Sequence, residues 1–283
     1  MDRELTSDRA RVVVVGDVDH GEFAEPVRWL GQRAVVTPLS RGADGSRRMR
    51  PLRDADLVVL AIPRPGRVSQ QDVDRIRAAA PLCRIVALLG SGCEGELRSG
   101  RPLQGVARVY WHQWLPPFAQ GLERMSLGEA CEWDLPATAT DDERSLWIDA
   151  KQRRTASGTV AVVARHASTV AALADACRLA GHVVVGASGD GATQFHGASV
   201  VLWDCARSAG EDVARVRSLV ARVAPTPVVV LAGFPRLDEF EAMLEAGAAA
   251  VVSKPARLAD LLWHLDAATR GDAASPLADY AAA

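Results

Sequence analysis

The sequence predicts an α/β protein with two doubly wound, parallel, five-stranded sheets in tandem. Short unbroken runs of β-branched and aliphatic residues recur along the 283 residues, and such runs are typical of parallel strands buried on both faces. Most of these runs are followed by a stretch with apolar residues at helical spacing, which predicts alternating strands and helices. The series of alternating strands and helices occurs twice along the chain, so we expect two domains of roughly 120 residues each.

The first half contains one complete series, and we expect a domain over residues 9–125. The predicted strands are 11–15, 34–37, 57–62, 84–89 and 106–111, and the predicted helices are 22–30, 68–80 and 116–125. Residues 40–53, rich in Arg and Gly, predict a loop, and the Gly-rich segment 90–105 shows no clear helical spacing. An aromatic run at the end of the last strand, VYWHQW, contains His112. We favour core packing over a ligand platform for its tryptophans.

The second half contains the clearer series, and we expect a domain over residues 158–270 followed by a frayed, flexible tail at 271–283. The predicted strands are 159–163, 182–186, 200–204, 228–231 and 249–253, and the predicted helices are 168–180, 190–195, 211–223, 237–246 and 257–269. Asp204 ends the third strand and Lys254 follows the fifth. Because the carboxyl ends of parallel strands share one edge, these two residues should lie close together.

Residues 126–157 form a predicted linker with a different character. Its first 25 residues carry seven acidic side chains and one basic one. Thr140, followed by Glu143, predicts the start of a short helix that carries Trp147. The segment is either a solvated connector or a contact surface, because a Trp in a polar linker tends to be buried against something.

Composition excludes several classes of function. The net charge of −2 and the pI near 6.3 give no electrostatic footprint for nucleic acid or an anionic membrane. The five cysteines are widely spaced, without CxxC or Cys/His ligand spacing, so neither a disulfide framework nor a zinc site is indicated. The start of the chain lacks a signal-peptide apolar core and no apolar run could span a membrane, so we expect a cytoplasmic protein.

One stretch after the first strand, GDVDHGEF, has the glycine frame of a phosphate-binding P-loop and resembles the GHVDHGKT stretch of translational GTPases. Its lysine position holds Glu22 and its hydroxyl position holds Phe23. A P-loop requires that lysine on the phosphates and that hydroxyl on Mg²⁺, so we interpret the stretch as a strand-to-helix turn. No GxGxxG, nucleophile elbow or Ser/His/Asp set is present, and we predict no catalytic residues and no enzyme.

The stretches ASVVLWD, AGAAAVVSKP and LADLLWHL give the second half a resemblance to the receiver domains of bacterial two-component response regulators. The first half also resembles a receiver domain: its stretches ADLVVLAIPRPG and DVDRIRAAAPLCRIVALLG are similar to the segment from the third to the fourth strand of a receiver. The resemblance implies a tandem of flavodoxin-like (βα)₅ domains. It also implies that Asp204 stands where the phospho-accepting aspartate stands and Lys254 where the invariant lysine stands.

Both halves depart from the receiver pattern. In the second half, Ala164 and Arg165 stand where an acidic pair should hold Mg²⁺, and Ala232 replaces a hydroxyl residue. In the first half, Asp17 remains as one acid and His112 stands in the place of the lysine, while Ala61 and Leu89 replace the acceptor and the hydroxyl residue. We predict that Arg165 occupies the place of the metal and pairs with Asp204; the alternative is that Arg165 points to solvent. No metal site is assigned with confidence.

These observations favour a signalling protein that acts through phosphorylation-independent contacts with protein partners, a pseudo-receiver. The segment 237–269, by resemblance the usual contact face of receivers, is the expected surface. One alternative is a stand-alone response regulator or phosphorelay member, phosphorylated on Asp204 by a histidine kinase, with Mg²⁺ as cofactor only in that case. Another is a nucleotide-binding protein or enzyme of flavodoxin-like fold. We expect no other cofactor; homodimer formation is left open.

Overall fold

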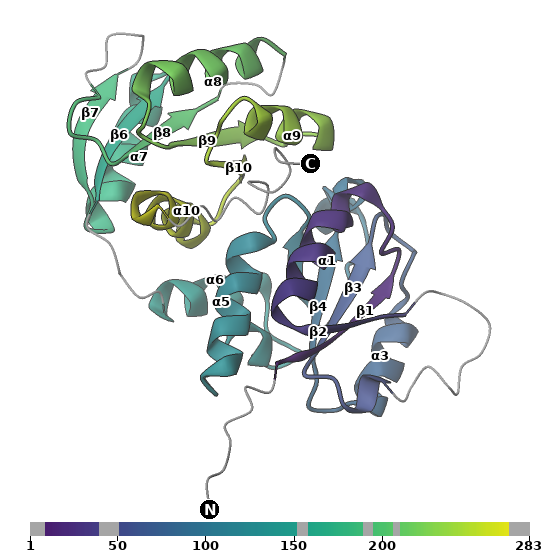
Figure 1. Ribbon diagram of the computed structural model, residues 1–283. Helices are drawn as coiled ribbons and strands as arrows, with labels where there is room; N and C mark the ends of the chain where they lie inside the picture. Colours follow the sequence, from purple (N-terminus) through teal and green to yellow (C-terminus); the bar gives the residue numbers. More distant parts are fainter. Residues whose placement is uncertain (1–8, 40–50, 152–157, 189–194, 206–209, 272–283) are drawn as a thin grey trace, which may run out of the picture. The chain divides into compact units, whose positions relative to one another are not determined.

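The computed structural model describes residues 9–39, 51–151, 158–188, 195–205 and 210–271. The chain divides into two compact units, Met1–Ile148 and Asp149–Ala283 (Figure 1). Each unit contains one five-stranded parallel sheet, as the two apolar series predict. Residues 190–194 of the helix predicted at 190–195, most of the predicted loop at 40–53 and the tail after Gly271 lie outside the described residues.

The first unit contains a sheet of order β2-β1-β3-β4-β5. Its strands are β1 (Arg11–Gly16), β2 (Val35–Leu39), β3 (Leu57–Ile62), β4 (Arg84–Leu89) and β5 (Ala107–Tyr110). Its helical elements are α1 (Gly21–Arg33), α3 (Gln70–Ala79), η1 (Ser91–Cys93), α4 (Glu96–Ser99), α5 (Leu115–Ser126), η2 (Glu132–Asp134) and α6 (Asp141–Lys151). The predicted strands and helices of this half are therefore confirmed to within a few residues at their ends.

Alternate residues of the first sheet contribute to cores on its two faces, because successive side chains of a strand point in opposite directions. On one face, Val58, Leu60 and Ile62 of β3 pack with Val73 and Ile76 of α3. Tryptophans belong to the core as well: the Trp29 ring of α1 meets that of Trp114, just before α5, edge-on with centroids 5.3 Å apart. The aromatic run at 109–114 therefore packs in the core, as the sequence favoured.

The second unit contains a sheet of order β10-β9-β8-β6-β7, the same arrangement as the first sheet counted from its own first strand. Its strands are β6 (Thr159–Ala164), β7 (Val183–Ser188), β8 (Val200–Asp204), β9 (Val228–Gly233) and β10 (Ala250–Lys254). Its helices are α7 (Ala167–Leu179), α8 (Gly210–Val223), α9 (Leu237–Glu245) and α10 (Leu258–Arg270). Both units thus have the 2-1-3-4-5 order of the flavodoxin-like (βα)₅ fold.

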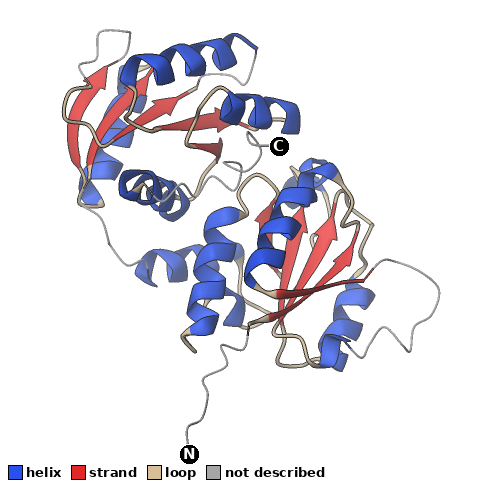
Figure 2. Ribbon diagram, in the orientation of Figure 1, coloured by secondary structure: helices blue, strands red, loops and turns tan. Residues whose placement is uncertain are grey.

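Helices cover both faces of the second sheet, as Figure 2 shows. One core joins the sheet to α7 and α10, for example through Cys177 and Leu265, which are fully buried. The other joins it to α8 and α9, for example through Val216 and Met243. The central strands β6, β8 and β9 are covered on both faces, so their residues are mostly apolar without alternation, whereas Val183 and Val185 of the edge strand β7 are exposed.

The segment predicted as a linker begins inside the first compact unit. Thr140 caps α6: its hydroxyl accepts a hydrogen bond from the Glu143 amide at 3.2 Å, and the Glu143 carboxylate accepts one from the Thr140 amide at 2.8 Å. Trp133 is 5 % exposed and packs its ring edge-on against Phe118 of α5. Trp147 is half-buried with the Arg124 guanidinium 5.6 Å from its ring centroid. The contact-surface alternative therefore describes residues 131–147 better than a solvated connector does.

Among the helices of the described ranges, none combines the length and apolar character that crossing a membrane requires.

Candidate functional site

The carboxyl edge of the second sheet brings together the two charged residues that the sequence placed there. Lys254, the last residue of β10, donates from Nζ to Oδ1 of Asp204 at 2.7 Å and to the backbone carbonyl of Cys205 at 2.9 Å. The Asp204 side chain is 12 % exposed and the Lys254 side chain 34 %. The carboxylate thus lies in a half-enclosed position with its charge balanced by one ammonium group.

The residues around this pair offer few oxygen atoms. Ala164 of β6 lies directly opposite Asp204 in the β6–β8 register, and Ala232 of β9 is fully buried at the place of the hydroxyl residue. Within the described ranges, no group of three or more His, Cys, Asp or Glu side chains is arranged to hold a metal ion. Mg²⁺ prefers carboxylate ligands, and here Asp204 is the carboxylate at the edge.

Arg165 follows β6 at this edge and is exposed. Among the described residues its guanidinium makes no ion pair with Asp204, which is instead paired with Lys254. The pairing of Arg165 with Asp204 in place of a metal therefore stays a prediction, as does the alternative in which Arg165 points to solvent and Asp204 caps the following turn.

Replacing Lys254 with methionine is expected to destabilise the second unit by about 1–2 kcal/mol. The substitution leaves the half-enclosed Asp204 carboxylate without its cation, which is costlier than losing an exposed ion pair; the partial exposure of Lys254 keeps the cost below that of a fully buried pair. Urea unfolding of Lys254→Met, Asp204→Asn and the double variant measures this. The double variant should lose less stability than the sum of the single ones. Additive losses would show that the pair contributes no coupling.

The carboxyl edge of the first sheet has a different set of side chains. Asp17 follows β1 and is half exposed, with Oδ2 3.4 Å from a guanidinium nitrogen of Arg67. His112 lies two residues after β5 and is 7 % exposed, with Nε2 3.1 Å from Oε1 of Glu94. In the part of the chain that the structure describes, no hydrogen bond or ion pair joins Asp17 to His112. The two residues that the resemblance assigned to this edge thus have separate partners.

Glu22 closes this edge, a role that the sequence did not predict. Its side chain is 8 % exposed and Oε2 accepts a hydrogen bond from the Ser91 amide at 3.0 Å, across 69 residues of sequence. A Cβ atom at Gly90 would lie 2.4 Å from the same oxygen, so the backbone passes close to the carboxylate only because residue 90 is glycine. The carboxylate fills the space beside the ends of β3 and β4. The glycines around Ser91 are the one sequence signal that could have indicated this close approach.

Burial governs the ionisation of the His112–Glu94 pair. It lowers the pKa of His112 to about 4, so the imidazole is neutral near pH 7 and its Nε2–H can donate to the Glu94 carboxylate. Burial, together with the negative charge of nearby Glu22, raises the pKa of Glu94. A neutral histidine cannot supply the positive charge that a lysine supplies at the corresponding place in the second unit.

The first unit is expected to lose stability as the pH falls from 6.5 toward 4. In that window the unfolded chain protonates His112 at its ordinary pKa of 6.5 while the folded protein does not, so the unfolded state binds more protons. The loss amounts to at most about 1.4 kcal/mol per pH unit, partly offset by the raised pKa of Glu94, which favours the folded state at low pH. Urea unfolding at pH 7 and pH 5 should therefore show a smaller loss for His112→Gln than for the parent. An equal loss would assign the pH dependence to other groups.

The sequence matches no protein-family model and no curated protein. Among solved structures, the response regulator ChrA of a heme-sensing two-component system is 22 % identical over 46 % of this chain and 68 % of its own, with a TM-score of 0.34. A response regulator from Thermotoga maritima is 21 % identical over 41 % of this chain and 99 % of its own, with a TM-score of 0.33. The C-terminal part of RcsC from E. coli, containing a linker region and a phosphoreceiver domain, is 14 % identical over 94 % of this chain and 95 % of its own, with a TM-score of 0.32.

With TM-scores below 0.5, these similarities assign no family to the chain. The strand order and the parallel registers themselves show two flavodoxin-like units in tandem.

Proposed function

We propose that the chain is a signalling protein whose receiver-like second unit acts through protein contacts without being phosphorylated. The observation that carries the proposal is the carboxyl edge of the second sheet. There Asp204 forms an ion pair with Lys254. Ala164 lies in register with Asp204, and Arg165 is the next residue after Ala164. Among the described residues, this edge thus has a carboxylate–ammonium pair and no group of acidic residues arranged to hold a metal.

The chemistry of aspartyl phosphorylation supports this reading. A phosphoryl group carries about two negative charges, and its transfer to a carboxylate depends on positioning and on neutralisation by a metal and a cation. Of the two neutralising groups, metal and cation, this edge supplies the cation: the ammonium group of Lys254, which already pairs with Asp204. Arg165 adds positive charge near the edge but no oxygen ligand for Mg²⁺. The pair is better suited to hold one fixed conformation than to switch between two.

Phe234 is an exposed aromatic residue in the proposed contact surface. It follows β9, whose last residue Gly233 is paired with Lys254, and its side chain is 58 % exposed. Its φ of 45° is a left-handed conformation that costs a bulky residue about 1–2 kcal/mol. Strained backbone conformations of this kind cluster at functional sites, and we therefore take Phe234 as a contact residue. Together with α9 and α10 it makes up the surface we assign to partner proteins.

The first test is intact mass spectrometry after incubation with Mg²⁺ and a small phosphoryl donor. The parent and Asp204→Asn should both remain free of a phosphoryl adduct, while a control receiver in the same tube is modified. An adduct on the parent that Asp204→Asn abolishes would overturn the proposal in favour of a response regulator phosphorylated on Asp204. The Asp204–Lys254 contact is the observation that favours this second function.

A second test addresses the contacts themselves. Proteins captured from an extract by the tagged full-length chain are compared for the parent, Asp204→Asn and Phe234→Ser. We expect a partner that the parent and Asp204→Asn retain equally and that Phe234→Ser loses. Release of the partner by Asp204→Asn, or by the phosphoryl donor, would contradict a phosphorylation-independent contact. Stoichiometric nucleotide in the purified protein would instead favour the nucleotide-binding alternative.

A further inference from the structure

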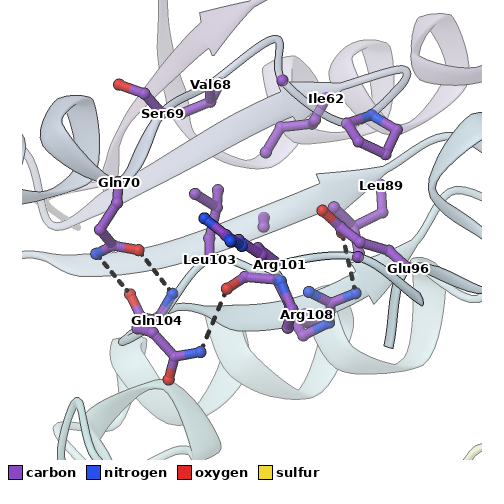
Figure 3. Close-up of a pocket in the computed structure, with 15 residues that line it drawn as sticks. Ile62, Val68, Ser69, Gln70, Leu89, Glu96, Arg101, Leu103, Gln104 and Arg108 are labelled. Carbon is purple, nitrogen blue, oxygen red and sulfur yellow. Dashed lines mark hydrogen bonds and ion pairs between the residues drawn. The ribbon is translucent and has the colours of Figure 1, made fainter. Parts of the chain in front are cut away.

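A pocket of about 730 Å³ opens on the sheet of the first unit, beside α4 (Figure 3). The helix α4 has only four residues, and the strand residues Ala87 and Leu89 at the base of the pocket are at most 2 % exposed. The pocket is bordered by the start of α3, by α4 and by the segment 100–104. Its volume lies within the range of about 300–1,000 Å³ that is typical of sites for small molecules. The pocket belongs to the first unit, whereas the Asp204–Lys254 pair belongs to the second.

The lining combines an apolar floor with positive charge. Ile62, Ala87 and Leu89 of β3 and β4 form apolar surface, together with Leu103. Three ionisable side chains line the pocket, Glu96, Arg101 and Arg108, so the lining carries one net positive charge. This combination suits a ligand with an apolar body and a negatively charged group.

Arg108 of β5 is the buried cation of the pocket. Its side chain is 7 % exposed, and its guanidinium donates to Oε2 of Glu96 over a long 3.4 Å, as Figure 3 shows. Its Nε finds no hydrogen-bond partner among the described residues; the carboxylate of Asp141 lies 3.9 Å away. Glu96 and Asp141 thus balance the charge of Arg108, but at distances that leave most of its five N–H donors without a close acceptor, and an anion in the pocket could accept from them.

Arg101 supplies a second, accessible guanidinium. It is exposed at the pocket and, within the part of the chain that the structure describes, makes no hydrogen bond or ion pair. In Figure 3 it lies between Leu103 and Arg108. Two guanidinium groups on neighbouring elements can bind one carboxylate or phosphate together, because each offers several donors in a planar fork.

The wall opposite the sheet is held in place by hydrogen bonds rather than by a ligand. The Gln104 amide donates to Oε1 of Gln70 at 2.9 Å, and Nε2 of Gln70 donates to the Gln104 carbonyl at 3.3 Å. Two turns further along α3, the guanidinium of Arg77 donates to the carbonyl of Gly105. The segment 100–105 is therefore fixed to α3, and a ligand would meet a preformed site with little ordering cost.

We propose that this pocket binds a small organic anion, with its carboxylate or phosphate on Arg101 and Arg108 and its apolar body against Leu103 and Pro102, above the buried floor of Ile62, Ala87 and Leu89. The ligand class follows from the lining: the charge selects an anion, and the apolar residues select a molecule with an apolar ring or chain. Such a site would make the first unit sensitive to a metabolite, independently of how the second unit meets its partners.

Ligand-observed NMR with the full-length chain tests the proposal using three probes: 2-naphthoate, 2-naphthamide and acetate. We expect 2-naphthoate to bind with a dissociation constant below about 1 mM. The neutral amide and acetate should each bind at least about tenfold more weakly, because one lacks the charge and the other the apolar body. Arg101→Ala should weaken 2-naphthoate about tenfold as well.

Arg98→Ala is the matched control, because Arg98 is exposed on α4 and does not line the pocket. It should leave binding unchanged. Equal binding of naphthoate and naphthamide, equal loss in both arginine variants, or no binding of naphthoate at about 1 mM would each overturn the proposal. Arg101 is exposed, so its substitution should leave folding intact, and the unchanged thermal midpoint of both variants verifies this.

Discussion

The triple variant Ala164→Asp, Arg165→Asp, Ala232→Thr is expected to accept a phosphoryl group on Asp204 in the presence of Mg²⁺. The substitutions place two carboxylates opposite Asp204 at the end of β6 and a hydroxyl at the end of β9. Together with Lys254 they supply the charge neutralisation that the parent lacks. Metal-assisted stabilisation is worth several kcal/mol, so we expect the rate of adduct formation to rise by at least about 100-fold.

Mass spectrometry with a small phosphoryl donor measures the adduct in the triple variant, in the triple variant with Asp204→Asn, and in Arg165→Ala/Ala232→Val. The second and third proteins should remain unmodified, because they lack the acceptor or the new oxygen atoms. Omitting Mg²⁺ should also abolish the adduct. If a folded triple variant stays unmodified, the missing oxygen atoms are not the sole reason why Asp204 is not phosphorylated. The hydrogen bond from Lys254 to Asp204 would be another.

Gly121→Ala is expected to destabilise the first unit by about 2 kcal/mol or more. Gly121 is buried in α5 under the Trp133 ring, and an ideal Cβ at this position would lie 2.2–2.6 Å from three ring atoms. Trp133 is 5 % exposed and has little room to move, so the added methyl group forces a shift of the ring or of α5. That cost outweighs the roughly 1 kcal/mol by which alanine is favoured over glycine inside a helix.

Gly31→Ala is the matched control, because it makes the same substitution in α1. Gly31 is exposed, and a Cβ there would meet no atom within 4 Å. It should therefore stabilise the chain by about 0.5–1 kcal/mol. Tryptophan fluorescence during thermal unfolding reports both effects, because only Trp203 and Trp263 of the seven tryptophans lie outside the first unit. Midpoints that move in the same direction for both variants would contradict the packing of Trp133 on Gly121.

Much of the fold is determined by the sequence alone. The strands are runs such as RVVVV and LVVLAI, whose unbroken apolar character requires burial on both faces, and the helices between them show apolar residues at helical spacing. These are local patterns, so they predict the order of elements without knowledge of contacts. The same reasoning brought Asp204 and Lys254 together, since the ends of parallel strands meet at one edge.

Only the tertiary structure decided which partners the other side chains have. Glu22 closes the first edge by accepting from the amide of Ser91, and Trp133 joins the predicted linker to α5. The pocket at Arg101 and Arg108 is bordered by α3, α4 and the segment 100–104. Each of these depends on the packing of segments far apart in sequence, where a difference of an ångström separates a contact from a clash. Local apolar periodicity carries no information about such distances, and so the elements were predictable while the side-chain partners were not.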